Sequence, residues 1–319
     1  MRASAFFSFF QRVDLGIWAT LGSGVIWGLL PLYWHMLRDF SPVLILCQRI
    51  VWSCLFLFPL VIATRRMGEV AKAARDGKLL RGLFCSSMIL ACNWGLYIWA
   101  VNNGKVVETS LGYFISPLIT ICMGVVVFRD RPGRTRWCAI LLAFAGVLAE
   151  IIINGIVPWT GLAIGACFSV YVLLRKLEPV ESLPGLMLET LILSPFALAF
   201  IFWTQFTTGA AVWGAASREV LLLAGTGVVT SVPLILYAYG ARHLPFTTLG
   251  LLQYLSPLIT GLLGLFVFME PLLPGRMVSF AAIWVALAVY TVDSIRSHGR
   301  SVGRDGVRVV PDHRKADGE

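Results

Sequence analysis

Long runs of apolar residues, separated by short polar segments, make up most of the chain. A helix that crosses a bilayer needs about 20 mostly apolar residues, because the hydrocarbon core is roughly 30 Å thick and each residue rises about 1.5 Å. The runs lack the strict polar–apolar alternation of membrane-spanning β-strands. The pattern predicts an all-α integral membrane protein with ten transmembrane helices, near residues 16–36, 43–63, 82–102, 109–128, 136–153, 158–174, 183–203, 218–240, 246–268 and 276–295.

Composition agrees with this class and excludes others. Of the 319 residues, 58% are hydrophobic and only 13% are charged, whereas a soluble domain has about 25% charged residues. So few charges cannot cover the surface of a globular protein. A cytosolic enzyme, a soluble nucleic-acid-binding module and a disordered chain are therefore excluded.

The positions of the basic residues predict the orientation in the membrane. Of the 26 Lys and Arg residues, 21 fall on one side of the predicted spans, four fall on the other side, and one lies within a span. Basic residues collect on the cytoplasmic side of membrane proteins, so both termini are predicted to be cytoplasmic. The net charge of +9 therefore reflects topology and does not indicate a nucleic-acid partner.

The chain also contains an internal repeat. Ser116–Thr120 recurs unchanged as Ser256–Thr260, and further matches on both sides keep offsets between 137 and 142 residues. We interpret the repeat as two five-helix copies, residues 16–153 and 158–295, flanked by a cytoplasmic or interfacial segment at 1–15 and a disordered cytoplasmic tail at 296–319. Because five is an odd number, the copies have opposite orientations. Inverted repeats are typical of secondary transporters, which alternate access to a site between the two halves.

Several residue runs resemble one group of transporters. These runs are Gly24–Trp34, Gln48-Arg49, Asn93–Gly95, Leu111–Phe114 and Leu249–Tyr254. They resemble the drug/metabolite transporter superfamily, and within it the EamA-type ten-helix permeases. The resemblance implies a multi-pass permease of the bacterial cytoplasmic (inner) membrane, with a central cavity between two halves, that moves a small organic metabolite or drug-like solute.

Polar and aromatic residues inside the predicted spans are candidates for lining a solute cavity. They are Trp27, Asn93, Tyr97, Tyr113, Ser116, Ser231, Tyr237, Gln253 and Tyr254. Amide and hydroxyl groups beside aromatic rings suit an uncharged or amphipathic solute, which they can orient without a large desolvation penalty. Hydrogen bonding between helices is an equally good explanation for each residue. Trp34, near a span end, is predicted to anchor the chain at the membrane interface.

Two charged residues lie well inside predicted spans, Arg49 and Glu189, and they are equivalent in the repeat at an offset of 140. A charge at that depth is unfavourable by roughly 3 kcal/mol, so each side chain should face protein or water. Each lies about 9 Å from its own membrane surface, which separates them by roughly 12 Å in depth. We therefore expect no direct bond between them and a role for each near one mouth of the pathway. A purely structural role for both remains the alternative.

Two further patterns concern helix shape and packing. Pro117 and Pro257 are equivalent in the repeat, and each should kink its helix because proline removes a backbone donor and clashes with the preceding turn. Gly24 with Gly28, and Gly161 with Gly165, have the small-xxx-small spacing that lets another helix backbone approach closely.

Signals for enzymatic chemistry are absent from the sequence. It has neither a nucleophile elbow, a phosphate-binding loop nor a metal-binding histidine pair, so neither a cofactor nor a metal is expected. We predict a secondary-active or facilitative transporter whose partners are a small-molecule solute and membrane lipids. Proton coupling through Glu189 and homodimer formation are left open. The alternative function is a non-transporting membrane sensor or scaffold with a duplicated helical core.

Overall fold

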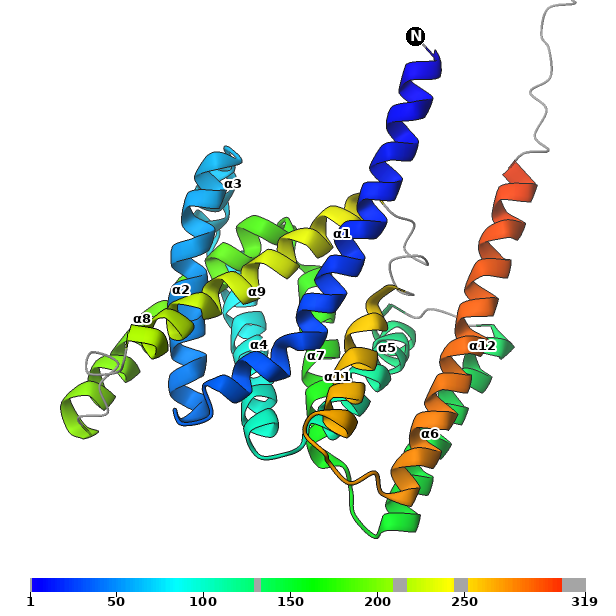
Figure 1. The fold of residues 1–319 in the computed structure, drawn as a ribbon. Coiled ribbons are helices and arrows are strands. Elements are labelled where there is room, and N and C mark those ends of the chain that lie inside the picture. Colours follow the sequence, from blue (N-terminus) through cyan, green and yellow to red (C-terminus); the bar gives the residue numbers. More distant parts are fainter. Residues whose placement is uncertain (1, 129–132, 209–216, 244–251, 306–319) are drawn as a thin grey trace, which may run out of the picture.

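The computed structural model describes residues 2–128, 133–208, 217–243 and 252–305, and within them every regular element is a helix (Figure 1). The helices of the first half are α1 (Arg2–Met36), α2 (Pro42–Ala63), α3 (Met67–Arg75), α4 (Gly77–Asn102), α5 (Val106–Phe128) and α6 (Arg134–Asn154). Those of the second half are α7 (Trp159–Leu177), α8 (Ser182–Thr208), α9 (Ser217–His243), α11 (Leu255–Phe266) and α12 (Pro274–Asp305).

Several helices meet the length and hydropathy requirements of membrane spans. Six described segments are long and apolar enough to cross a bilayer, namely Leu15–Met36, Pro42–Ala63, Gly77–Asn102, Trp137–Asn154, Ser182–Thr207 and Arg218–Tyr237. Two shorter apolar helices, Trp159–Arg175 and Leu255–Phe266, accompany them. The chain is therefore a multi-pass helical membrane protein.

Each predicted span overlaps one of these helices, but three details differ from the prediction. The polar segment after α2 contains the additional helix α3, whose apolar residues Val70 and Ala73 are buried. Helix α12 continues to Asp305, so residues 296–305 of the tail predicted to be disordered are helical. No proline interrupts this stretch, and extending an existing helix requires no new nucleation. Of the span predicted at 246–268, residues 246–251 lie outside the described residues, and Tyr254 forms a turn between the helical residues 252–253 and α11.

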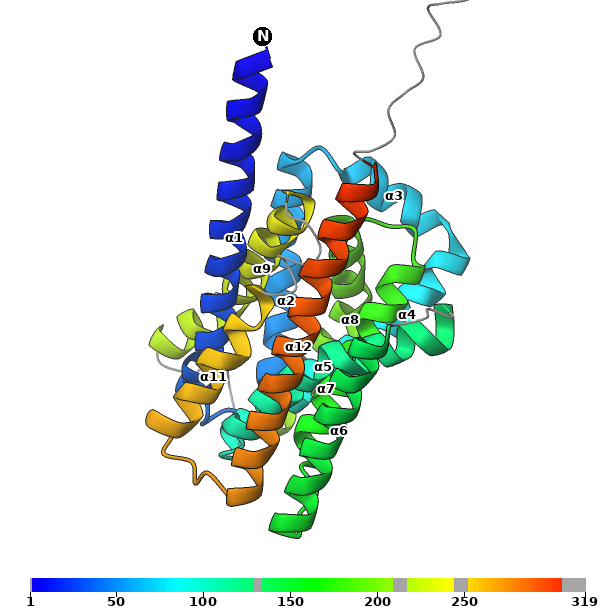
Figure 2. The same ribbon diagram turned by 90° about the vertical axis from the view of Figure 1, so that its right-hand side faces the viewer.

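The helices form three neighbouring groups (Figures 1 and 2). Helices α6 and α12 lie side by side along one edge and make the most extensive contact of the fold. On the opposite side, α2 packs against both α8 and α9. Between these groups, α1 contacts α9 and α11, and α7 contacts α4 and α5.

Glycines bring two pairs of helices into backbone contact. A Cβ atom built on Gly161 would lie 2.5 Å from the carbonyl oxygen of Glu108, and one on Gly165 would lie 2.6 Å from that of Gly112, both on α5. On α1, a Cβ atom at Gly28 would lie 2.6 Å from the Cβ of Ile259 on α11. The close helix approach predicted from the glycine spacing is thus observed for α7 against α5 and for α1 against α11.

Carboxylates cap two helices from a distance in sequence. Glu108 of α5 accepts hydrogen bonds from the backbone N–H groups of Thr160 (2.9 Å) and Gly161 (3.3 Å) at the start of α7. Glu270, between α11 and α12, accepts from Val106 (2.6 Å) and Val107 (2.8 Å) at the start of α5. The first N–H groups of a helix have no partner within the helix, and a negative charge there also complements the helix dipole.

Candidate functional site

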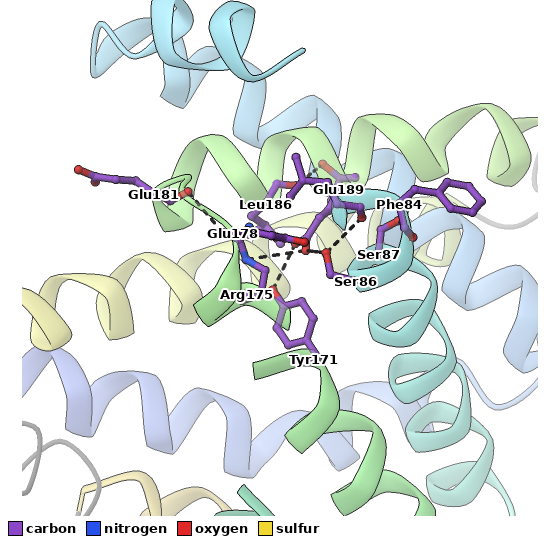
Figure 3. Close-up of polar contacts among 11 residues, drawn as sticks. Phe84, Ser86, Ser87, Tyr171, Arg175, Glu178, Glu181, Leu186 and Glu189 are labelled. Atoms are coloured by element: carbon purple, nitrogen blue, oxygen red, sulfur yellow. Dashed lines mark hydrogen bonds and ion pairs between the residues drawn. The ribbon is translucent and has the colours of Figure 1, made fainter. Parts of the chain in front are cut away.

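The carboxylate of Glu189 lies at the centre of a buried polar network that joins three helices (Figure 3). Its side chain, on α8, is completely inaccessible to solvent. Ser86 of α4 donates a hydrogen bond of 2.6 Å to Oε1, and Tyr171 of α7 donates one of 3.2 Å to Oε2. The Nε of Arg175, also on α7, lies 3.8 Å from Oε1. Glu189 thus has hydroxyl and cationic partners, as a buried charge requires.

Arg175 connects this network to the polar turn between α7 and α8. Its Nη1 donates a 2.8 Å hydrogen bond to Glu178, and its Nη2 donates a 3.4 Å hydrogen bond to the carbonyl oxygen of Glu181. One guanidinium therefore contacts two carboxylates on either side of the turn. Such a network can hold the end of α7 against α8. Protonation of Glu189 would remove the negative charge that attracts Arg175 and would therefore weaken the network.

The guanidinium of Arg49 lies in a second, different environment, formed by aromatic rings. Its Cζ is 4.0 Å from the ring centroid of Trp94 on α4 and 5.1 Å from that of Trp34 on α1. The residue is only 4% exposed, although it lies on α2 within a membrane span. Among the described residues, no acceptor lies within hydrogen-bonding distance of its buried Nε–H. The tryptophan faces provide cation–π attraction, but the Nε–H group is left without an acceptor among the described residues.

Three of the predicted lining residues lie together near Arg49. Asn93 donates a 2.9 Å hydrogen bond from Nδ2 to the carbonyl oxygen of Ile164 on α7, and its Oδ1 accepts one of 3.3 Å from the hydroxyl of Tyr113. The rings of Tyr97 and Tyr113 pack edge to face with centroids 5.7 Å apart. Both tyrosines lie near Arg49.

The other predicted lining residues fall into smaller groups. Gln253 donates a hydrogen bond to the hydroxyl of Tyr237, whose ring lies 5.6 Å from that of Trp27. Tyr254 stacks on Phe114 of α5, with centroids 6.3 Å apart.

Two serines of the predicted set are buried at other positions. The hydroxyls of Ser116 on α5 and Ser169 on α7 lie 3.1 Å apart. Ser231 on α9 is buried, and its hydroxyl has no hydrogen-bond partner among the described residues.

Arg49 and Glu189 do not form an ion pair, since Glu189 contacts Arg175 and Arg49 contacts two tryptophans.

The two prolines that are equivalent in the repeat lie at different positions within their helices. Pro117 lies within the continuous helix α5, whereas Pro257 lies in the first turn of α11, three residues after the turn at Tyr254. The carbonyl oxygen of Pro257 accepts a 2.6 Å hydrogen bond from Ser110 of α5.

The prediction for Trp34 was wrong. Its side chain is 0% exposed and lies against Arg49, so it cannot anchor the chain at the lipid interface. Distance from a span end indicates depth along the membrane, but it does not tell whether a residue faces lipid or protein.

Sequence reasoning also missed the partners of Glu189, namely Ser86, Tyr171 and Arg175. Arg175 counted only as a cytoplasmic basic residue, and a serine or tyrosine within a span is too common to single out. Arg175 and Glu178 do have the three-residue spacing that brings helical side chains together, and this was the one available signal. Within the described ranges, no cluster of three His, Cys, Asp or Glu residues could hold a metal ion.

Comparison with known proteins identifies the family. The profile of the EamA-like transporter family matches residues 14–151. An uncharacterized transporter of Pseudomonas aeruginosa is 41% identical over 275 residues, which cover 86% of this chain and 92% of the relative. Protein RarD of Streptomyces exfoliatus is 37% identical, over 91% of this chain and 92% of the relative. Protein RarD of Escherichia coli K12 is 34% identical, over 91% and 98%.

The fold is also found in a protein of known crystal structure. That protein is 16% identical and has a TM-score of 0.57, with coverage of 88% of this chain and 98% of its own. The resemblance that the residue runs indicated is confirmed by the sequence relatives. The chain belongs to the EamA-like transporter family, and its relatives within that family include the RarD proteins.

Proposed function

We propose that the chain is a secondary-active or facilitative transporter of the bacterial cytoplasmic membrane, with ten spans and cytoplasmic termini. It moves a small organic solute by alternating access between two inverted five-helix halves. The names of its relatives and its long apolar helices support membrane transport. The pattern of helix contacts is the observation that carries the mechanism.

The main contacts between helices are preserved when each helix is replaced by the equivalent helix of the other half. The exchange pairs α1 with α7, α2 with α8, α4 with α9, α5 with α11 and α6 with α12. It converts the contact of α1 with α9 into that of α7 with α4, and the contact of α1 with α11 into that of α7 with α5. The contacts of α2 with α8, α5 with α11 and α6 with α12 are each converted into themselves. This relationship supports a duplicated unit with a pseudo-twofold axis between the halves.

Because the halves are equivalent, the protein can adopt two similar conformations in which the solute site opens to opposite sides of the membrane. Glycine-rich faces join α7 to α5 and α1 to α11, where a small shift of one backbone along another removes no side-chain interlocking. The prolines at 117 and 257 are the proposed bending points of the helices packed against these faces. The solute lies between the halves, beside the lining residues described above, with Arg49 and Glu189 near opposite mouths.

Flux measurements on the purified chain in proteoliposomes test this function. A broad panel of labelled metabolites, compared with protein-free vesicles, should contain solutes whose uptake saturates and shows counterflow when the vesicles are preloaded. Leakage or a simple pore would not produce counterflow. Absence of flux across the panel would contradict transport and favour a membrane sensor or scaffold.

Proton coupling through Glu189 is part of the proposal and has its own test. The buried network with Ser86 and Arg175 gives this carboxylate neighbours that would respond to its protonation. Glu189→Gln should abolish accumulation driven by a pH gradient while leaving counterflow of the same solute measurable. Glu69→Gln, which changes an acid exposed on α3, is the matched control. Gradient-driven accumulation that persists in Glu189→Gln would remove this role.

A further inference from the structure

Arg49 is a buried cation that no acid of the described chain neutralises. Its faces are covered by Trp94 and Trp34, and two neutral tyrosines, Tyr97 and Tyr113, lie nearby. The acid at the equivalent repeat position, Glu189, is bound to Arg175 instead. A cation in a membrane span without a counter-ion is unfavourable, so an anion that enters this place would be strongly stabilised.

The donors around Arg49 also lack acceptors. Both Nε–H of Arg49 and the indole Nε1–H of Trp34 are buried without a hydrogen-bond partner among the described residues. Ser53, four residues after Arg49 and therefore on the same face of α2, has a buried hydroxyl with no partner either. Folded proteins leave few buried polar groups unsatisfied, and a group of neighbouring ones calls for a specific explanation.

A second cation, Lys105, shows that contact with tryptophan rings does not by itself leave a cation without hydrogen-bond acceptors. Lys105 also lies over two indole rings, those of Trp99 at 5.1 Å and Trp159 at 4.9 Å. Unlike Arg49, it is partly exposed and also contacts the hydroxyl of Thr160 at 3.4 Å. Within the part of the chain that the structure describes, two cations stack on tryptophan, and of these two only Arg49 is also buried with an unsatisfied donor.

We propose that Arg49 binds the carboxylate of the transported solute, which makes the solute class small organic acids with an apolar or aromatic body. This inference rests on the proposed transport function and specifies its substrate. The indole faces hold the guanidinium plane, so its N–H edge can meet the two oxygens of a carboxylate. Trp34 and Ser53 supply further donors, and Tyr97, Tyr113 and Trp94 provide aromatic surface for the body of the solute.

The test compares three probes that share one body and differ only in the polar group. They are 3-phenylpropionate, 3-phenylpropionamide and 3-phenylpropylamine, with hexanoate and hexanamide as an aliphatic pair. Binding to the full chain in lipid nanodiscs is measured by equilibrium dialysis. The acids should bind at least about tenfold more tightly than the amides, because hydrogen bonds to a charged group are stronger than neutral ones. The amine should bind more weakly than the amide.

Three variants assign the preference to this site. Arg49→Gln should weaken binding of both acids by about 10- to 100-fold and should weaken binding of the amides much less, so that the preference for acids is lost. Trp34→Phe keeps an aromatic ring at this position but removes the indole N–H group, so binding of the acids should fall several-fold and binding of the amides should fall less. Lys105→Gln, which removes the other stacked cation, should leave the preference intact.

Several outcomes overturn the inference. They are equal binding of acid and amide by the unsubstituted protein, binding of none of the probes, an acid preference that persists in Arg49→Gln, and an equal loss in Lys105→Gln. If Arg49→Gln does not fold, the acid–amide comparison and Trp34→Phe still decide the question.

Flux of the same probes in proteoliposomes separates this inference from the transport proposal. Acid-selective binding without flux of any solute contradicts transport and supports the Arg49 site. Flux of the amide or the amine without flux of the acid supports transport and contradicts an anionic substrate.

Discussion

The hydroxyl of Ser86 donates a 2.6 Å hydrogen bond to the carboxylate of Glu189, and both residues are completely buried. The bond joins α4, in the first predicted half, to α8, in the second. Because Tyr171 and Arg175 bind the same carboxylate from α7, its interactions depend on how three helices are positioned. Motion between the halves would therefore change the surroundings of this carboxylate.

Removal of Arg175 should destabilise the protein strongly. Arg175→Met leaves two carboxylates, Glu178 and Glu189, without their cation, and the loss of one member of a buried pair costs about 3–5 kcal/mol. Addition of Glu189→Gln to Arg175→Met should restore more than about 1 kcal/mol, because the remaining buried charge is then removed. Denaturant unfolding in detergent measures both effects.

Arg66→Met is the matched control for this prediction. Arg66 pairs with Glu69 at 2.9 Å and with Glu181, but both acids are about half exposed. Exposed ion pairs contribute about 0–1 kcal/mol to stability. The free energy of unfolding of this variant should therefore be close to that of the unsubstituted protein. An effect of Arg66→Met as large as that of Arg175→Met would contradict the importance of burial.

Enlargement of Gly165 should disturb the contact between α7 and α5. In Gly165→Ala the added Cβ would lie 2.6 Å from the carbonyl oxygen of Gly112, so the helices must move apart, at a cost of about 1–3 kcal/mol. Gly68→Ala on α3 is the control, since nothing lies within 4 Å of its added Cβ. It should stabilise helix α3 by up to about 1 kcal/mol. A fall in Tm for Gly165→Ala and none for Gly68→Ala is the expected result.

The cap of α5 by Glu270 should make stability depend on pH. Burial raises the pKa of Glu270, against the opposing effect of the hydrogen bonds from Val107 and Val106. The folded state therefore holds this proton more tightly than the unfolded state. The stabilising free energy that comes from this tighter proton binding by Glu270 is fully present below the unfolded pKa of about 4.3. It is lost as pH rises through the raised folded pKa.

Substitution of Glu270 checks this assignment. Glu270→Gln keeps an acceptor for one backbone N–H group but cannot titrate, so the difference in Tm between it and the unsubstituted protein should change with pH over that window. A constant difference across the window would show that Glu270 titrates alike in both states.

Labelling of single cysteines tests the predicted topology. In a background with all seven native cysteines replaced, a cysteine at Asn103, between α4 and α5, should react with a membrane-impermeant maleimide in intact cells. A cysteine at Gly68 on α3 should react only after the membrane is permeabilised. Both positions are exposed in the structure, so reactivity depends on the side of the membrane. The reverse pattern would invert the proposed orientation.

Much of the architecture was predictable from the sequence because its signals are local or periodic. Apolar runs of about 20 residues predict helices one at a time, and each predicted span overlaps a helix of the structure. The spacing of Gly161 and Gly165 predicted close packing for the same reason, since one helix face is defined by its own residues. The location of α3 and the continuation of α12 were missed, because polar helices carry no comparable apolar signal.

The chemistry of the site was predictable only in its residue types. The sequence alone determined that Arg49 and Glu189 are charges in an apolar environment, and that they occupy equivalent positions in a repeat. Only the tertiary structure decided that Glu189 contacts Ser86, Tyr171 and Arg175, while Arg49 contacts two indole rings and none of the described acids. The physical reason is that the partner of a buried charge is set by which helix faces meet. These contacts between helix faces bring together residues as far apart in the sequence as Ser86 and Glu189, and no local sequence pattern predicts them.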